Sequence, residues 1–448
     1  MGNNGLNNRN PQRPVNTGRP QNRNGRPSQS RKAPIRLGGQ QRNNAGAAVR
    51  RNPVPSVQPQ NGGAAALNKN GKKKLINFSI PEKFDFSFFL IVIILLAFGL
   101  VMLFSATFAS AKWRYGDSYY FVKRQLIFAG IGVAAMIVIS YIDYHVFMQK
   151  VLLKFAILGS VALMVLVRLF GKTVGGAERW IKIGEITIQP SEILKLVTII
   201  VIADYMQRNY EKIGDFRRGF FPAMLRVAIS CALVILQPHL SCTIIIFVVC
   251  FCMLCIGGAK ASHLWLVVGA VAVLGLLIIK VFPAMGFDYV TTRFLSFNDP
   301  EADVMDKTYQ TYQSLVTIGS GGLFGQGLGN SRQKYSYLPI TENDFIFPVI
   351  VEELGFVGAI LVILLFVILL VRGFYIASSA PDKFGMLLCA GIVIQIGLQA
   401  FMNIAVATNA MPNTGVSLPF ISYGGTALMM QLGEMGIVLN ISRKAALE

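Results

Sequence analysis

FFLIVIILLAFGLVMLFSAT, residues 88–107, decides the fold class, because its twenty residues include no charged side chain. A helix of that length spans the roughly 30 Å hydrocarbon core of a bilayer. Nine further apolar runs follow, with approximate cores at Leu126–Ile142, Val151–Phe170, Pro190–Met206, Pro222–Leu236, Cys242–Gly257, His263–Phe282, Phe345–Val371, Phe384–Thr408 and Phe420–Asn440. The sequence therefore predicts an all-α polytopic membrane protein with about ten transmembrane helices.

The composition agrees with a membrane protein. The 448 residues are 53% hydrophobic and only 14% charged, and the mean hydropathy is +0.52. Ordinary soluble domains carry about 25% charged residues. The low share of charge excludes an ordinary soluble enzyme as the class of the whole chain.

The formal net charge of +20 comes largely from the first 83 residues, which are rich in Asn, Gly, Pro, Gln and Arg. Residues 1–83 have no acid before Glu82 and too few large apolar side chains to offset the entropy of ordering. We expect a disordered basic cytoplasmic tail that is attracted to anionic lipid headgroups. No aromatic side chains are interleaved with its arginines to stack bases, so nucleic acid is not an expected partner.

An even number of spans places both termini on the same side of the membrane. The basic tail favours the cytoplasm for that side, as do Arg208, Lys212, Arg217, Arg218, Arg226, Arg443 and Lys444. The predicted membrane domain covers residues 84–444, and residues 445–448 form a short cytoplasmic end. Residues 284–344, between the seventh and eighth spans, then form a large extracytoplasmic loop.

The fourth span begins with a charged pair. Pro190 suits a helix start, because it has no amide hydrogen to satisfy there. Glu192 and Lys195 follow at i, i+3 spacing, so they share a helix face and can pair within the membrane. Ionisable residues inside a span face protein or a wet cavity. Two interpretations stay open: a structural ion pair between helices, or part of the wall of a substrate cavity.

A second basic group lies at the outer entry of the second span. Lys123, Arg124 and Gln125 follow one another there. Cations in that place suit the phosphate or diphosphate of a lipid. The alternative is that both long side chains only anchor the helix at the membrane interface.

The large loop contains three aspartates close together. Asp299 precedes a proline and is typical of a turn start, and Asp306 precedes Lys307 and can pair with it. Asp303 has no adjacent cation, which suits a base that must take a proton. Asp303 is therefore the predicted catalytic residue, and Asp306 is a secondary candidate acid.

Glycines recur between residues 319 and 329 and allow main-chain amides to approach an anion closely. Arg332 and Lys334 follow directly and are candidates to neutralise a leaving phosphate. A flexible hinge is the alternative interpretation of these glycines. No Gly-Lys-Ser/Thr follows, so the segment is not a nucleotide-binding P-loop.

The last span is preceded by a stretch rich in glycine and hydroxyl groups, from Gly415 to Thr426. Irregular main chain at membrane depth is tolerated only where protein or water satisfies it. The stretch is interpreted as a cavity wall. Glu434, inside the last span, has no assigned role.

Taken together, these motifs resemble the SEDS family (shape, elongation, division and sporulation), whose members include FtsW, RodA and SpoVE. The resemblance covers about Phe84 to Arg443 and rests on the joint order of several short motifs. These are Phe121–Gln125, Gly176–Trp180, Gln189–Glu192 with Lys195, Tyr309-Gln310, Gln313-Ser314, Gly325–Gly329, Asp344–Phe347, Glu352–Gly355 and Pro419–Gly425. Residues 327–339 are more similar to the division and sporulation branch, that of FtsW and SpoVE, than to the elongation branch.

The resemblance implies a peptidoglycan glycosyltransferase that polymerises lipid II into glycan strands at the outer face of the bacterial cytoplasmic membrane. It also implies a class B penicillin-binding protein, a transpeptidase, as partner, together with other divisome or elongation proteins. A divalent cation, magnesium or manganese, is a candidate cofactor, its ligands are unknown, and no organic cofactor is expected. Candidates for binding the substrate or its diphosphate are Arg124, Gln125, Arg179, Arg332, Lys334, Ser422, Tyr423, Gly424 and Gly425.

The family's essential aspartate lies in a pattern like Asn-Pro-x-x-Asp-Pro-x-Gly-x-Gly-Tyr-Gln. Here the aspartate is kept as Asp303, but the proline and both glycines after it are replaced. His239 stands where the family usually has an aspartate after Gln-Pro.

Two rival functions use the same features. A lipid II transporter would use the intramembrane charges without needing Asp303 as a base, although no internal repeat is evident in the sequence. A non-catalytic division scaffold would depend on the basic tail instead.

Overall fold

The computed structural model describes residues 84–170, 172–174, 177–183, 186–237, 239–284, 297–301, 303, 308–331 and 343–445. The chain divides into two compact units, Met1–Ala66 and Leu67–Glu448, and every described residue belongs to the second unit. The predicted disordered tail, residues 1–83, lies outside the described residues.

Each of the ten predicted spans coincides with a helix among the described residues. The helices are α1 (Phe86–Tyr115), α2 (Tyr120–Tyr141), α3 (Lys150–Phe170), α4 (Pro190–Arg208), α5 (Phe221–Ile235), α6 (Leu240–Ile256), α7 (Ala261–Ala284), α10 (Ile346–Ser378), α11 (Lys383–Ala407) and α12 (Gly425–Lys444). Six of the described helices are long and apolar enough to cross a membrane, and Leu240–Ile256 and Ala261–Leu277 are shorter apolar helical segments. The predicted helical membrane fold is confirmed.

Smaller elements connect these helices. They are the 3₁₀-helices η1 (Tyr144–Met148) and η2 (Tyr210–Lys212), the π-helix η3 (Phe216–Phe220), helix α9 (Tyr309–Gly321) and strands β1 (Lys172–Val174), β2 (Ala177–Ile183) and β3 (Ile186–Ile188). The strands form an antiparallel sheet in the order β1-β2-β3. The sequence predicted only a loop there. Because the strands are so short, they give no long alternating pattern from which to predict them.

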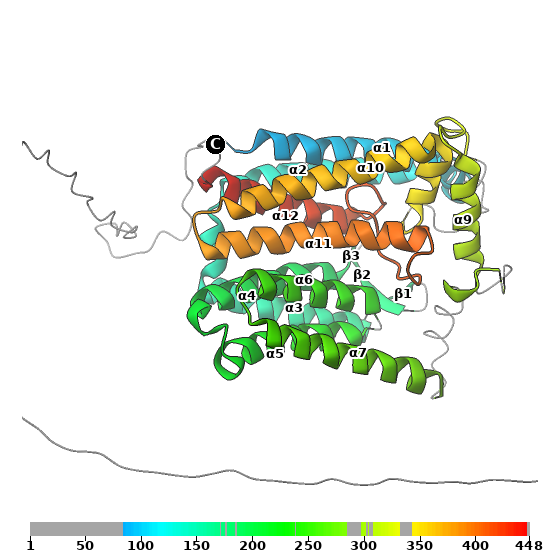
Figure 1. Cartoon of the computed structure of the whole chain (residues 1–448). Helices are drawn as coiled ribbons and strands as arrows, with labels where there is room; N and C mark the ends of the chain where they lie inside the picture. The colour runs from blue at the N-terminus through cyan, green and yellow to red at the C-terminus, as the bar shows by residue number, and fades with distance from the viewer. Residues whose placement is uncertain are drawn as a thin grey trace, which may run out of the picture. The chain divides into compact units, whose positions relative to one another are not determined.

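The helices pack as neighbours along most of their length (Figure 1). Helix α12 packs on α2, α10 on α11, and α1 on both α2 and α10. Helices α4 and α6 contact α11 from the other side, and α3 and α5 pack on α4. The approach of α12 to α2 requires glycine at 436, because a Cβ there would lie 2.7 Å from the carbonyl oxygen of Met136.

Helix α10 is broken at Gly355, whose φ of 71° and ψ of −168° lie far from helical values. The break is closed by the segment that follows α9. The amides of Gln326 and Gly327 donate to the carbonyls of Glu352 and Glu353, at 2.9 and 3.0 Å. In return, the amides of Phe356 and Val357 donate to the carbonyls of residues 322 and 323. The glycine-rich segment is therefore a fixed part of the fold, and the hinge interpretation is wrong for residues 321–327.

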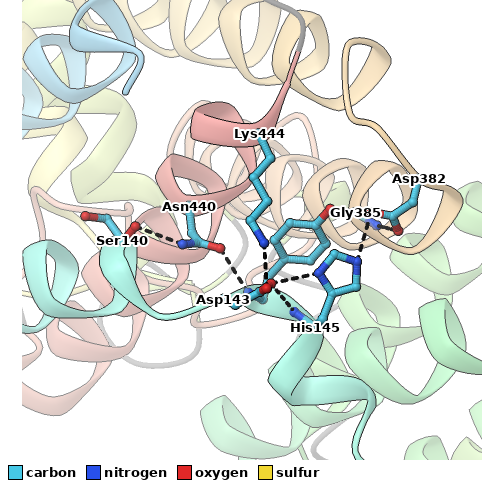
Figure 2. Close-up of polar contacts among 8 residues, drawn as sticks. Ser140, Asp143, His145, Asp382, Gly385, Asn440 and Lys444 are labelled. Atoms are coloured by element: carbon cyan, nitrogen blue, oxygen red, sulfur yellow. Dashed lines mark hydrogen bonds and ion pairs between the residues drawn. The ribbon is translucent and has the colours of Figure 1, made fainter. Parts of the chain in front are cut away.

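Side chains from two connections and from the end of α12 meet at the end of the bundle where α12 terminates (Figure 2). Nδ1 of His145 lies 2.7 Å from Asp143 Oδ1, and its Nε2 lies 3.3 Å from Asp382 Oδ2. Lys444 Nζ lies 2.6 Å from the other oxygen of Asp143. The Tyr144 hydroxyl donates to Asp382, and we refer to these five residues as the terminal cluster. The cluster joins the α2–α3 connection to the start of α11 and the end of α12.

Candidate functional site

The predicted ion pair exists and is buried near the start of α4. Lys195 Nζ lies 2.8 Å from Glu192 Oε2, and the exposed fractions of their side chains are 2% and 14%. Pro190 occupies the first turn of the helix, as its sequence position predicts. A buried pair of this kind compensates the cost of removing both charges from water only when other polar groups also contact it.

The pair lines a small cavity of about 40 Å³ inside the bundle. The cavity is also lined by His239 and Ser241 from the start of α6, by Gln399 from α11, and by the main-chain stretch from Gly415 to Ser417. The prediction that the stretch before the last span forms a cavity wall is confirmed for these residues. Ser241 donates its hydroxyl hydrogen to the carbonyl of Thr414, which ties α6 to that stretch.

Sequence reasoning missed Gln399 and the residues beside it. Gln399 and Gln431 are hydrogen-bonded at 3.3 Å, and Gln431 in turn accepts from the amide of Phe420 at 3.2 Å. All three are buried. The available signal was the glutamine at 399 within an apolar run, since a buried amide in a span must find a partner in protein or water.

Glu434 now has a structural context. It is 1% exposed, and both of its carboxylate oxygens lie 2.9 Å from Gln395 Nε2, which donates to them. Lys195 interacts electrostatically with Glu434 as well as with Glu192. Two carboxylates and one ammonium therefore share the interior of the bundle between α4, α11 and α12.

A second group lies at the N-terminal ends of α2 and α12. Gln125, only 1% exposed, donates to the carbonyl of Ser422 at 3.1 Å and accepts from the amide of Gly424 at 3.3 Å. Its amide group is thus used to hold the stretch before α12. Gly425, the first residue of α12, lies against the ring of Phe128, and a Cβ added at this position would overlap that ring.

Arg124 lies beside this group. Its guanidinium carbon is 4.5 Å from the centre of the Tyr120 ring, and it also contacts the hydroxyl of Tyr423. The Tyr423 ring packs edge-on against Phe121, with ring centres 5.0 Å apart. The structure therefore brings together the predicted residues Arg124, Gln125, Ser422, Tyr423, Gly424 and Gly425.

Asp303 is partly exposed and is held by its main chain at the start of α9. Its amide donates to the Thr308 hydroxyl at 3.2 Å, and its carbonyl accepts from the Thr308 amide at 3.1 Å. These two bonds fix the main chain of Asp303 against Thr308, the residue before α9. Asp299 accepts from the amide of Glu301 at 3.1 Å, which confirms it as a turn residue.

The start of α9 is fixed against the connection between α11 and α12. Ser314 donates to the carbonyl of Ala407 at 2.7 Å, and Asn413 donates to the side-chain oxygen of Gln310 at 3.2 Å. Asn409 donates to the carbonyl of Phe297 at 3.2 Å. The acidic loop, α9 and the stretch before α12 are therefore neighbours at one end of the bundle.

Two buried acids support this end from within. The Ser105 hydroxyl lies 2.7 and 2.6 Å from the two carboxylate oxygens of Glu353, and Ser331 donates to Glu352. Both glutamates are at most 1% exposed. Glu352 and Glu353 directly precede the break in α10. Their side chains contact Ser331 and Ser105, and their carbonyls accept from the amides of residues 326 and 327.

The remaining predicted residues are not all described. Asp306, Arg332 and Lys334 lie outside the described residues, and Arg179 lies in β2 with its side chain outside them. Within the described part of the chain, polar contacts join Glu192 to Lys195 and join Gln125 of α2 to the stretch before α12. They do not join Asp303 to either group.

The sequence of this chain is similar to those of known proteins. Residues 86–447 match a family model described as "Cell cycle protein", that of FtsW, RodA and SpoVE. "Stage V sporulation protein E" of Bacillus subtilis (strain 168) is 39% identical over 80% of this chain and 97% of its own. A "Probable peptidoglycan glycosyltransferase FtsW" of Geobacter sp. (strain M18) is 36% identical over 81% of this chain and 98% of its own.

Solved structures are similar as well. A chain from "Structural coordination of polymerization and crosslinking by a peptidoglycan synthase complex" aligns with a TM-score of 0.68 and 26% sequence identity. The alignment covers 82% of this chain and 99% of that chain. The similarity therefore extends over the whole helical bundle.

Proposed function

Because the chain belongs to the FtsW, RodA and SpoVE family of cell cycle proteins, we propose that it is a peptidoglycan glycosyltransferase that polymerises lipid II. The observation that carries this proposal is the family match over residues 86–447, with curated relatives named as glycosyltransferases. The reaction takes place at the outer face of the bacterial cytoplasmic membrane, during septal or related wall synthesis. The chain is a multi-pass membrane protein, and in this proposal both termini are cytoplasmic.

Strand growth requires the 4-hydroxyl of an acceptor sugar to attack an anomeric carbon that carries a lipid diphosphate. The C–O bond to the diphosphate breaks as the new glycosidic bond forms, and the hydroxyl proton must be accepted. Asp303 is the proposed base, because it keeps the aspartate of the family's pattern and its main chain is held against Thr308 at the start of α9. Its partial exposure allows it to reach a substrate at the membrane surface.

The leaving diphosphate needs positive charge close to its oxygens. Arg124 is the proposed group among the described residues, since it lies at the outer end of α2 beside Tyr423. Arg332 and Lys334 are proposed for the same task on the sequence alone. Gln125 acts indirectly in this proposal: it holds Ser422 and Gly424 in place.

A divalent cation remains a prediction. The described residues contain no group of three His, Cys, Asp or Glu side chains that could hold a metal ion. A class B penicillin-binding protein is the proposed partner, because the similar chain of known structure comes from a peptidoglycan synthase complex. Lipid II and the lipid-linked glycan chain are the proposed substrates.

The test is lipid II polymerisation by the full-length chain with its class B partner, comparing wild type, Asp303→Asn and Asp299→Asn. Asp299 is the matched control, because it lies in the same loop and its carboxylate serves a local turn. We expect strands from wild type and the control and none from folded Asp303→Asn. Strands from Asp303→Asn would exclude Asp303 as the base and direct the search to Asp306.

Transport is the second candidate function, because three ionisable side chains share the interior of the bundle. If the wild-type complex makes no strands while its partner is active, lipid II movement across vesicles becomes the assay of choice. A loss of movement in Lys195→Met would then support the transporter.

A further inference from the structure

A groove of about 180 Å³ lies between α3, α4 and α5, apart from the residues proposed for catalysis. Its walls come from Ile157 and Val161 on α3 and from Ile229 and Leu233 on α5, and its floor from α4. Ile157 and Ile229 are 39% and 54% exposed, so the groove opens to the surroundings of the bundle. In a membrane those surroundings are lipid chains.

The floor of the groove contains hydroxyl groups whose hydrogen bonds are made within the protein. Thr198 Oγ1 donates to the carbonyl of Leu194 at 2.7 Å and lies 3.0 Å from Ser230 Oγ. Ser160 donates to the carbonyl of Ile157 at 2.9 Å. Satisfied hydroxyls do not require water, so the groove can take an apolar chain without leaving a polar group unpaired.

One end of the groove is basic. Arg226 lines it from α5, and its guanidinium carbon is 4.1 Å from the centre of the Tyr205 ring. Arg226 also donates to the carbonyl of Pro222 at 2.6 Å, which uses one of its five N–H groups. Lys154 is exposed on α3, and it shares a helix face with Ile157 and Val161 through i, i+3 and i+7 spacing.

Lys154 and Arg226 lie at the same end of the groove. Arg208, the last residue of α4, donates to the carbonyl of Met148, two residues before α3 begins. Tyr205, one turn before the end of α4, contacts Arg226 near the start of α5. No carboxylate among the described residues is paired with Lys154 or Arg226.

The length of the groove fits one leaflet. The floor runs from Leu194 to Val201, which is about 10 Å along a helix. One leaflet contributes about 15 Å of the hydrocarbon core. A lipid chain that follows the groove would therefore place its headgroup at the basic end, which is the cytoplasmic end in the proposed topology.

We propose that this groove binds an anionic glycerophospholipid of the cytoplasmic leaflet. One acyl chain lies along the groove between α3 and α5, and the phosphate is held by Lys154 and Arg226. The apolar walls suit an acyl chain, and the two cations attract a headgroup with a net negative charge. A zwitterionic lipid would bring an ammonium group close to the same two cations, which would repel it. The binding is separate from the proposed reaction, so it is measured without reference to polymerisation.

The experiment is native mass spectrometry of the full-length protein in detergent, titrated with phosphatidylglycerol or phosphatidylcholine of the same acyl chains. We expect wild type to bind phosphatidylglycerol about tenfold more tightly. The double variant Lys154→Gln/Arg226→Gln should bind both lipids alike. Lys383→Gln removes a similarly exposed cation from α11, outside the groove, and should keep the preference.

A third variant tests the groove itself. Ile229→Trp changes an exposed position, so folding should be retained, and its larger ring fills the groove and should weaken the binding of both lipids. Equal binding of the two lipids by wild type would overturn the proposal. So would an unchanged preference in the double variant, or binding of a polyprenyl phosphate in place of phosphatidylglycerol.

Discussion

Nε2 of His145 lies 3.3 Å from Oδ2 of Asp382, so the α2–α3 connection contacts the residue that caps the start of α11. The other ring nitrogen faces Asp143 at 2.7 Å. Both nitrogens donate only when the imidazole is protonated. Both contacts of His145 with the carboxylates of the terminal cluster are therefore hydrogen bonds only when His145 is a cation.

The terminal cluster should make stability depend on pH in the alkaline range. Hydrogen bonds to Asp143 and Asp382 raise the pKa of His145 from 6.5 to about 9. A raised pKa in the folded state means that the stabilisation is complete below about pH 6.5 and is lost as pH rises through about 9. Because the ring is 44% exposed, we expect only about 1 kcal/mol of the free energy of unfolding to be lost.

The measurement is the unfolding temperature of wild type and His145→Gln across this pH range. Wild type should lose stability between about pH 8 and pH 10, and the variant should lack that component of the change. Identical pH profiles for the two proteins would show that the imidazole is not the group responsible.

Replacing Gly355 should destabilise the bundle. A Cβ at this position would overlap the amide nitrogen of Gly325 and the carbonyl of Leu323, and the φ of 71° disfavours any side chain. Strain of this kind costs about 1–3 kcal/mol before any overlap is counted. Unfolding of Gly355→Ala in detergent measures the loss. Gly269→Ala is the matched control, because nothing lies within 4 Å of its added Cβ, and it should be neutral or slightly stabilising.

Replacing one residue of the buried ion pair should lower the free energy of unfolding more than replacing both. Lys195→Met leaves Glu192 without its partner, and such a change costs about 3–5 kcal/mol in a buried site. The double variant Glu192→Gln/Lys195→Met should lose less, since it leaves no charge from this pair. Chemical unfolding of both single variants and the double variant gives the coupling. If the loss of unfolding free energy in the double variant equals the sum of the losses in the two single variants, Glu192 and Lys195 do not interact directly.

Ser105→Ala should weaken the contact between α1 and α10. It removes the hydroxyl that contacts both oxygens of buried Glu353, and a hydrogen bond to a charged group is worth about 1.5–3 kcal/mol. Ser110→Ala, on the same helix, removes only a bond to a carbonyl of its own helix and should have little effect. Equal unfolding temperatures for both variants would show that Glu353 is held by other groups.

The sequence predicted the helices well because each long apolar run must be covered by hydrocarbon or protein. The run at residues 88–107 ends within α1, which continues to Tyr115 and is closed by Gly116 with a φ of 74°. The pairing of Glu192 with Lys195 was also predictable, since one helix face holds both.

Contacts between distant residues were not predictable in the same way. Gln125 was a candidate for substrate binding, yet its amide holds main-chain groups about 300 positions further along the chain. Gln395 gives Glu434 its context from another helix. The break in α10 was not predicted, because it is closed by hydrogen bonds to residues 322–327, which lie about 30 positions earlier in the chain.

The break in α10 also makes the stability of this helix depend on an earlier segment of the chain. Two carbonyls and two amides at the break form hydrogen bonds with main-chain groups of residues 322–327, which precede α10 in the chain. An unsatisfied main-chain group in a membrane costs several kcal/mol. The two segments therefore depend on each other: displacing residues 322–327 would leave main-chain groups of α10 without these partners, and α10 would be destabilised at its break.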